Sequence, residues 1–265
     1  MIRQILAAAV LLSFTVACQA AEAPLKIQTT LPWLESVARF IVGATAEIKS
    51  VSWWTEAGSL RSPRRIARDV PTIALDPRDA ASFGFKDGGV HLLYENLPVP
   101  DENRSKIPFD PSILPFLSQR MLIVLSRLSP DNYSFFQRRL AEFQSRLEST
   151  LEVGRSLIGG VRILDLTGAT SPWIRAATGG AVRPPDDLWK AWSVGDRTGE
   201  LVTAIEEANR RAWWILTDAW TPATIRSRVQ TAARSIAISP PPRDYAFFSY
   251  LHDIYLEIWA ASTAQ

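Results

Sequence analysis

The stretch SPDNYSFFQRRLAEFQSRLESTLE (129–152) decides the fold of this chain, because it predicts one long helix. Ser129 suits the N-cap of that helix, and Pro130 suits its first position. Apolar residues recur at spacings of 3, 4, 3, 4 and 4, as on one face of an amphipathic helix: Tyr133, Phe136, Leu140, Phe143, Leu147 and Leu151. A helix of about 25 residues is roughly 37 Å long. Such a helix can run the height of two lobes.

Strand-like and helix-like segments alternate on both sides of this helix. The predicted strands are LKIQTT (25–30), EIKSVSWW (47–54), PTIALDP (71–77), GGVHLLYEN (88–96), VRILDL (161–166), WWILTD (213–218) and IAIS (236–239). The predicted helices are LESVARFIVG (34–43), SPWIRAAT (171–178), ELVTAIEEANRRA (200–212), TPATIRSRVQTAARS (221–235) and YAFFSYLHDIYLEIWAAS (245–262). Strands separated by helices favour parallel sheets with right-handed crossovers.

The predicted fold class is therefore α/β, with two lobes that each hold a small, mostly parallel sheet flanked by helices. We expect an N-terminal lobe over residues 22–128, one long rigid helix over 129–157 that joins the lobes, and a C-terminal lobe over 158–265. A chain of 265 residues is long enough for two modest cores.

The first residues have the pattern of an export signal. Arg3 precedes the apolar run ILAAAVLLSFTV (5–16), and small residues follow in ACQAAEA (17–23). The run is too short to cross a bilayer, which takes about 20 residues. We expect a signal peptide over residues 1–21 and a periplasmic protein. Cys18, the only cysteine, is either discarded on cleavage or becomes a lipidated N-terminus, and Thr15 in place of the usual leucine favours the first alternative.

Composition and motifs exclude several classes of function. The net charge is only +2, which gives no indication of nucleic-acid binding. The sequence has no G-x-S-x-G, H-E-x-x-H, C-x-x-C or glycine-rich phosphate-binding pattern. The only two histidines, His91 and His252, have no His or Cys at ligand spacing, although Asp253 adjoins His252. We therefore expect a protein that is not an enzyme and has no cofactor.

Six short segments resemble a known family. They are LKIQTTLPWL (25–34), GSLRSP (58–63), PFDP (108–111), VRILDLTGATSPWI (161–174), WILTDAWTPATI (214–225) and IAISPPP (236–242), set around the long helix. In this order they resemble the periplasmic solute-binding proteins of zinc and manganese ABC importers. The resemblance covers nearly all of the chain after the signal, and it implies two lobes, a rigid spanning helix and small closure motions.

The resemblance also implies where a metal would be held. In that family three histidines and one acidic residue, or two of each, bind the cation between the lobes. The matching positions here are Ser59 in GSLRSP, Lys106 ahead of FDP, Gly168 after VRILDLT, and Ser239. Side chains of these types do not bind a divalent cation well. The sequence therefore predicts that the metal ligands have been replaced.

A ligand between two α/β lobes should contact residues that follow the strands. The candidate ligand-binding residues are Trp33, Ser59, Arg61, Lys106, Thr170, Asp218, Trp220 and Ser239. Lys106 and Arg61 could hold an anion, or Lys106 could pair with Asp218, or both cations could point to solvent. Asp218 could orient a ligand, or it could be a capping or salt-bridging residue. Trp33 and Trp220 could be aromatic walls for an organic ligand or could pack the lobes together.

Three functions remain open. The first is an exported solute-binding protein that delivers a small organic anion or a metal chelate to an ABC permease in the inner membrane. The second is the binding of zinc or manganese through ligands not placed here. The third is a periplasmic accessory protein without a ligand, with a surface rich in the chain's ten tryptophans. We expect a monomer in each case.

Overall fold

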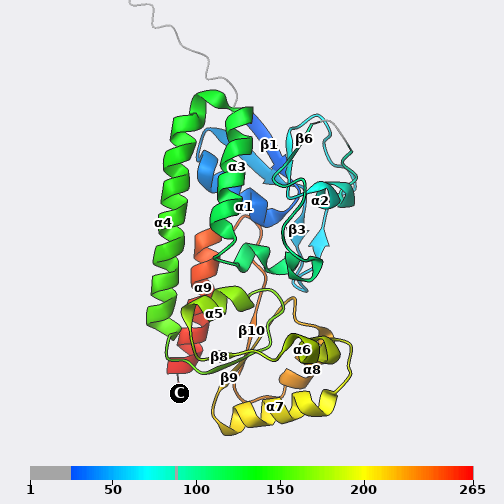
Figure 1. The fold of residues 1–265 in the computed structure, drawn as a ribbon, viewed down its shortest axis with the longest axis vertical. Coiled ribbons are helices and arrows are strands. Elements are labelled where there is room, and N and C mark those ends of the chain that lie inside the picture. Colours follow the sequence, from blue (N-terminus) through cyan, green and yellow to red (C-terminus); the bar gives the residue numbers. More distant parts are fainter. Residues whose placement is uncertain (1–24, 87–88, 265) are drawn as a thin grey trace, which may run out of the picture.

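The computed structural model describes residues 25–86 and 89–264. Two sheets lie one below the other, and the long helix α4 (Tyr133–Ile158) runs beside both of them (Figure 1). This confirms the predicted α/β fold class. The predicted signal peptide (1–21) and Cys18 lie outside the described residues. None of the described helices is long and apolar enough to cross a membrane.

The first sheet has the strand order β2-β1-β5-β6, and all its pairs are parallel. Its strands are β1 (Leu25–Thr29), β2 (Ala46–Ser50), β5 (Thr72–Ala74) and β6 (Val90–Leu92). The accompanying helices are α1 (Pro32–Val42), α2 (Pro77–Ser82), the 3₁₀ helix η1 (Asp101–Phe109) and α3 (Leu114–Leu128). A separate antiparallel hairpin consists of β3 (Trp53–Trp54) and β4 (Leu60–Arg61). The predicted strand 47–54 is thus two strands, divided between the sheet and this hairpin.

The second sheet has the order β10-β9-β7-β8 and is also parallel. Its strands are β7 (Ile163–Asp165), β8 (Ala181–Val182), β9 (Trp214–Asp218) and β10 (Ser235–Ile238). Its helices are α5 (Ser171–Ala177), α6 (Asp186–Ser193), α7 (Thr198–Arg210), α8 (Ala223–Val229) and α9 (Phe247–Thr263). Helix α7 buries one face, at Leu201, Ile205 and Ala208. The division of the chain into domains at residues 21, 128 and 157 stays a prediction.

The long helix starts later than its sequence pattern suggests. A 3₁₀ turn (Pro130–Asn132) precedes α4, and no side chain caps the helix. The Ser129 hydroxyl instead accepts a hydrogen bond from Asn132 Nδ2 at 2.8 Å. Helix α3, which packs on α1 and α4, was not predicted. Its run MLIVL is apolar on all sides, and that obscures the helical period.

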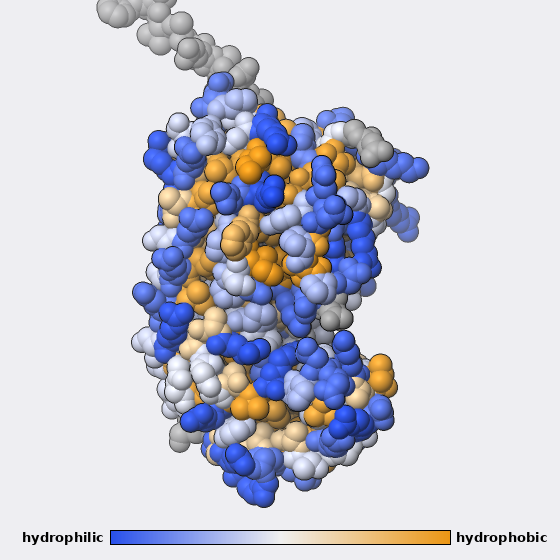
Figure 2. All heavy atoms as spheres, viewed as in Figure 1, coloured by the Kyte–Doolittle hydropathy of each residue, from blue (hydrophilic) through white to orange (hydrophobic). Residues whose placement is uncertain are grey.

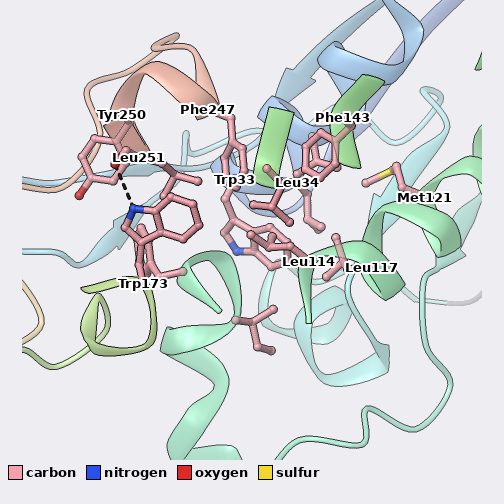
Figure 3. Packing of buried hydrophobic residues seen from close by; sticks show 14 of the residues in the cluster. Trp33, Leu34, Leu114, Leu117, Met121, Phe143, Trp173, Phe247, Tyr250 and Leu251 are labelled. Atoms are coloured by element: carbon pink, nitrogen blue, oxygen red, sulfur yellow. Dashed lines mark hydrogen bonds between the residues drawn. The ribbon is translucent and has the colours of Figure 1, made fainter. Parts of the chain in front are cut away.

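One continuous apolar core joins the two lobes. Figure 3 shows Trp173 of the second lobe in line with Trp33 and Leu34 of the first. Trp173 stacks on Tyr255 of α9, with ring centroids 5.3 Å apart, and its indole donates a hydrogen bond to the Leu251 carbonyl. Separating the lobes would expose this core to water, which opposes large hinge motions.

The contact between α4 and α9 leaves no room for a side chain at Gly154. A Cβ atom there would lie 2.3 Å from the ring of Tyr255, whose hydroxyl is held by the Trp173 carbonyl at 3.1 Å. We expect Gly154→Ala to lower the free energy of unfolding by about 1–3 kcal/mol through overpacking. Urea denaturation measures this change. Gly199→Ala in α7 is the control, because a Cβ there meets nothing within 4 Å. Equal stability of the two variants would contradict the tight packing.

Candidate functional site

Two neighbouring cavities lie where the lobes meet, and both are lined by Trp33, Trp54 and Pro108. The first, here called the aromatic cavity, has a volume of about 290 Å³. Its lining includes six aromatic side chains, from Trp33, Trp54, Phe109, Tyr245, Phe247 and Tyr250, and four prolines. The second cavity, of about 390 Å³, is also lined by Asp79, Arg104 and Trp220. The aromatic cavity therefore has the apolar walls typical of an organic-ligand site.

Elements from both lobes build the aromatic cavity. Pro32, at the start of α1, sets the helix that presents Trp33 and Glu35. The loop between β10 and α9 contributes residues 241–245 to the lining, and the first residue of α9, Phe247, completes this wall. The hydroxyl of Tyr250 donates a 2.7 Å hydrogen bond to the Ser239 carbonyl, which fixes this loop on α9. Burial raises the pKa of Tyr250 far above its usual value, so its hydroxyl keeps its proton and remains a donor.

Glu35 is the acidic group of the aromatic cavity whose side chain is mostly buried. Only 14% of its side chain is exposed. Its Oε2 accepts a hydrogen bond from the Ser50 amide at 2.8 Å, and its Oε1 lies 3.4 Å from Arg39 Nη1. Burial raises the pKa of Glu35, while the Ser50 amide and Arg39 oppose the rise. The carboxyl group is therefore held in place but is poorly solvated.

The second cavity has polar groups that are already paired with one another. Arg104 makes a two-pronged ion pair with Asp76, with Nη2 to Oδ1 at 2.9 Å. Asp79 accepts hydrogen bonds from the Thr30 hydroxyl and the Leu75 amide, and burial raises its pKa. These bonds hold α2 and η1 against the first sheet. The aromatic cavity is the better candidate for a ligand.

Trp33 and Trp220, two of the predicted ligand-binding residues, are brought together at the wall of the second cavity. The ring of Trp220 lies 5.3 Å from both Trp54 and Phe109. Its Nε1 is buried and has no hydrogen-bond partner among the described residues. These contacts place Trp220 as a bridge between the lobes. Its role in ligand binding, like that of Trp33, stays a prediction.

Asp218 and Thr170 form part of a buried hydrogen-bond network. The carboxylate of Asp218 accepts hydrogen bonds from the amides of Gly168, Ala169, Thr170 and Trp220 and from the hydroxyls of Thr170 and Thr221, at 2.8–3.1 Å. Both side chains are almost fully buried. This arrangement supports the capping alternative for Asp218, because the carboxylate holds two loops of the second lobe together.

The remaining predicted site residues lie outside the two cavity linings. Ser59, Arg61 and Ser239 are exposed. Lys106 is half-buried, and its Nζ donates a hydrogen bond to Asn103 Oδ1 at 2.7 Å. At Gly168 a Cβ atom would lie 2.3 Å from the Trp220 carbonyl oxygen, so a histidine cannot replace this glycine without moving the backbone. Binding of a ligand by these residues stays a prediction.

The described residues offer no ready metal site. Within 25–86 and 89–264, no three His, Cys, Asp or Glu side chains come together where they could hold a metal ion. The carboxylates that line the aromatic cavity, and could serve as metal ligands, are those of Glu35, mostly buried, and of the exposed Asp244. A structural zinc site takes about four convergent ligands, so this donor set does not fit a bare divalent cation.

Sequence reasoning missed Glu35, Trp54, Phe109 and the 241–250 segment. Glu35 is only two residues from Trp33, but on a helix that spacing does not predict a shared cavity. Its meeting with Ser50 and the β10–α9 loop depends on the packing of both lobes. The run SPPPRDYAFF (239–248), with its prolines and aromatics, was the one available signal.

Several solved structures share this fold. "Crystal structure of ZnuA" superposes with a TM-score of 0.68 at 14% identity, over 91% of this chain and 100% of the other. The fold is that of the periplasmic metal-binding proteins. FpvC from Pseudomonas aeruginosa, in complex with Mn²⁺, gives a TM-score of 0.60 at 15% identity, over 90% of this chain and 98% of the other.

A Cd-bound periplasmic metal-binding protein from Candidatus Liberibacter asiaticus gives a TM-score of 0.62 at 9% identity, over 89% of this chain and 98% of the other. No family model and no curated protein matches the chain. The metal-binding-protein fold thus confirms the sequence resemblance at the level of fold.

The Asp218 network gives a direct test of its structural role. Asp218→Asn replaces one acceptor oxygen by an NH2 group, a donor that would face the backbone N–H groups of the network. We expect the free energy of unfolding to fall by about 1–3 kcal/mol. Chemical denaturation measures the loss, with the exposed Asp131→Asn as a control of equal charge change. An Asp218→Asn protein as stable as the control would refute the structural role.

Proposed function

We propose that this protein is the exported solute-binding component of an ABC importer, and that it holds a small organic molecule or a metal chelate in the aromatic cavity. The single observation that carries the proposal is an aromatic-lined cavity of about 290 Å³ built from both lobes. Its partner would be a permease in the inner membrane, and it would act as a periplasmic monomer.

The shared fold supports capture of a solute between lobes. Relatives in fold include a Mn²⁺ complex and a Cd-bound protein, which bind their cations in the context of this architecture. In this chain the Trp220 carbonyl leaves no room for a side chain at Gly168. The ring of Trp220 bridges the lobes through its contacts with Trp54 and Phe109. A bare zinc or manganese ion would need ligands brought together by a rearrangement of the described residues. We therefore favour a ligand bound through aromatic surface.

A ligand-free accessory protein is the second candidate. The continuous core through Trp173 and Tyr255 favours it, because the lobes would not open to take up a ligand. In that case the aromatic cavity would be a packing defect with no occupant. The two candidates differ in whether filling the cavity has a functional consequence.

Filling the aromatic cavity tests the proposal. Ser36 lies on α1 in the lining, and its hydroxyl bonds only locally, to the Pro32 carbonyl at 3.3 Å. We expect native mass spectrometry of protein released gently from the periplasm to show an organic or chelate adduct. The adduct should be lost in Ser36→Phe, because the larger side chain occupies the ligand's space.

Ser149→Phe on the exposed side of α4 is the matched control and should keep the adduct. Thermal melting of both variants checks that they are folded. A bare zinc or manganese adduct would replace the proposed function with metal binding. A bare protein mass, with no melting shift on addition of periplasmic extract, would favour the accessory role.

A further inference from the structure

The charged groups around the aromatic cavity are not equivalent. Four charged residues line it: Glu35, Lys49, Arg243 and Asp244. Glu35 is the one whose side chain is mostly buried, at 14% exposure. The side chains of Lys49 and Asp244 are 77% and 69% exposed, and Arg243 is also exposed. The charge that a bound molecule would meet inside the cavity is therefore that of Glu35.

The positive groups at the rim already have partners. Lys49 Nζ lies 2.5 Å from Glu47 Oε1. The guanidinium of Arg243 sits over the ring of Trp53, 5.1 Å from its centroid. Both side chains are exposed, and water screens charges as exposed as these. Their interaction with Glu35 is therefore weak.

Arg39 is the cation closest to Glu35, and it interacts with two carboxylates, those of Glu35 and Asp244. Its Nη1 lies 3.4 Å from Glu35 Oε1 and 3.8 Å from Asp244 Oδ1. Half of the Arg39 side chain is exposed, so its interaction with either carboxylate is weak. A carboxylate offers about four lone-pair sites, of which the Ser50 amide and Arg39 use two. Glu35 therefore keeps capacity for a further donor.

The aromatic walls of the cavity, like Glu35, favour a positively charged ligand. Ring faces of Trp, Tyr and Phe attract cations, most strongly where water is excluded. Trp33, Phe247 and Tyr250 are less than 10% exposed, and Figure 3 shows Phe247 beside Trp33. Aromatic walls and one buried carboxylate together make a poor site for an anion.

We propose that the aromatic cavity binds a compact organic cation, with Glu35 as its counter-ion and the aromatic side chains around its apolar body. The proposal rests on the proposed function, namely that this cavity holds the ligand, and it names the ligand's class. A primary or quaternary ammonium group on a small ring or branched carbon skeleton fits both the charge and the volume of about 290 Å³.

Burial of the Glu35 carboxylate has a cost in folding free energy. Because burial raises its pKa, the folded protein binds the Glu35 proton more tightly than the unfolded chain does. This group's contribution to stability therefore falls as the pH rises from below the ordinary carboxyl pKa to above the raised pKa of Glu35. Glu35→Gln should consequently melt no lower than the wild type at neutral pH, while it loses the ligand's counter-ion.

Three probes of matched size and different charge test the proposal: cyclohexylammonium, cyclohexanol and cyclohexanecarboxylate. Isothermal titration calorimetry of each against the purified full-length protein should show the cation binding at least about tenfold more tightly than the alcohol, a difference of about 1.4 kcal/mol. The carboxylate should bind most weakly. Glu35→Gln should remove the preference for the cation and leave the affinity for cyclohexanol unchanged.

Glu152→Gln is the control of equal charge change, on the exposed side of α4, and should keep the preference. Equal affinities for the three probes, tightest binding of the carboxylate, or a preference that survives Glu35→Gln would overturn the cation assignment. If cyclohexanol or the carboxylate binds at least as tightly as the cation and Ser36→Phe abolishes that binding, the cavity is a ligand site for another class and the proposed function stands. No heat from any probe overturns the cation assignment, and the adduct measurement with Ser36→Phe then decides the proposed function separately.

Discussion

The packing of α9 against α4 and α5 is the constraint on which the rest of the structure depends. Gly154 lets α4 and α9 approach, and Tyr255 fills the space against Trp173. This packing carries the β10–α9 loop to the N-terminus of α1, where it closes the aromatic cavity. Because the core is continuous, the cavity is a fixed feature of the two-lobed unit.

The second lobe uses one buried carboxylate to hold two of its loops together. Asp218 gathers amides from two loops, and its acceptor sites are filled by protein donors. Gly168 is required by the resulting backbone approach to Trp220. A buried carboxylate saturated in this way stabilises the loops but has little left for a cation. In this chain the Asp218 network is a structural joint, and free volume remains beside Trp33 and Trp54, which line both cavities.

The fold could be predicted from the sequence further than the site could. The apolar period of α4 and the alternation of strands and helices are local patterns, and they specified both lobes. Helix α3 was not predicted, because its apolar residues cover more than one face. The short β8 was not predicted either, because two residues are too few to show the alternation of a strand. The cavity could not be predicted, since Glu35 and Phe247 are more than 200 residues apart and meet only through tertiary packing. The position-by-position resemblance drew attention to Ser59 and Ser239, which are exposed.

Access to the cavity is constrained by how its walls are built. The wall formed by Phe247 and Tyr250 belongs to the shared core, so displacing it would expose apolar surface of both lobes. Trp54 belongs to the β3–β4 hairpin, whose two short strands pair only with each other among the described strands. The hairpin meets the second lobe at Gly58, where a Cβ atom would lie 3.0 Å from the Ala219 carbonyl, and through the edge contact of Trp54 with Trp220. Moving the hairpin breaks far fewer contacts than separating the lobes. Under the proposed function, a small ligand would therefore exchange by local opening at Trp54, without the hinge motion that a two-lobed outline suggests.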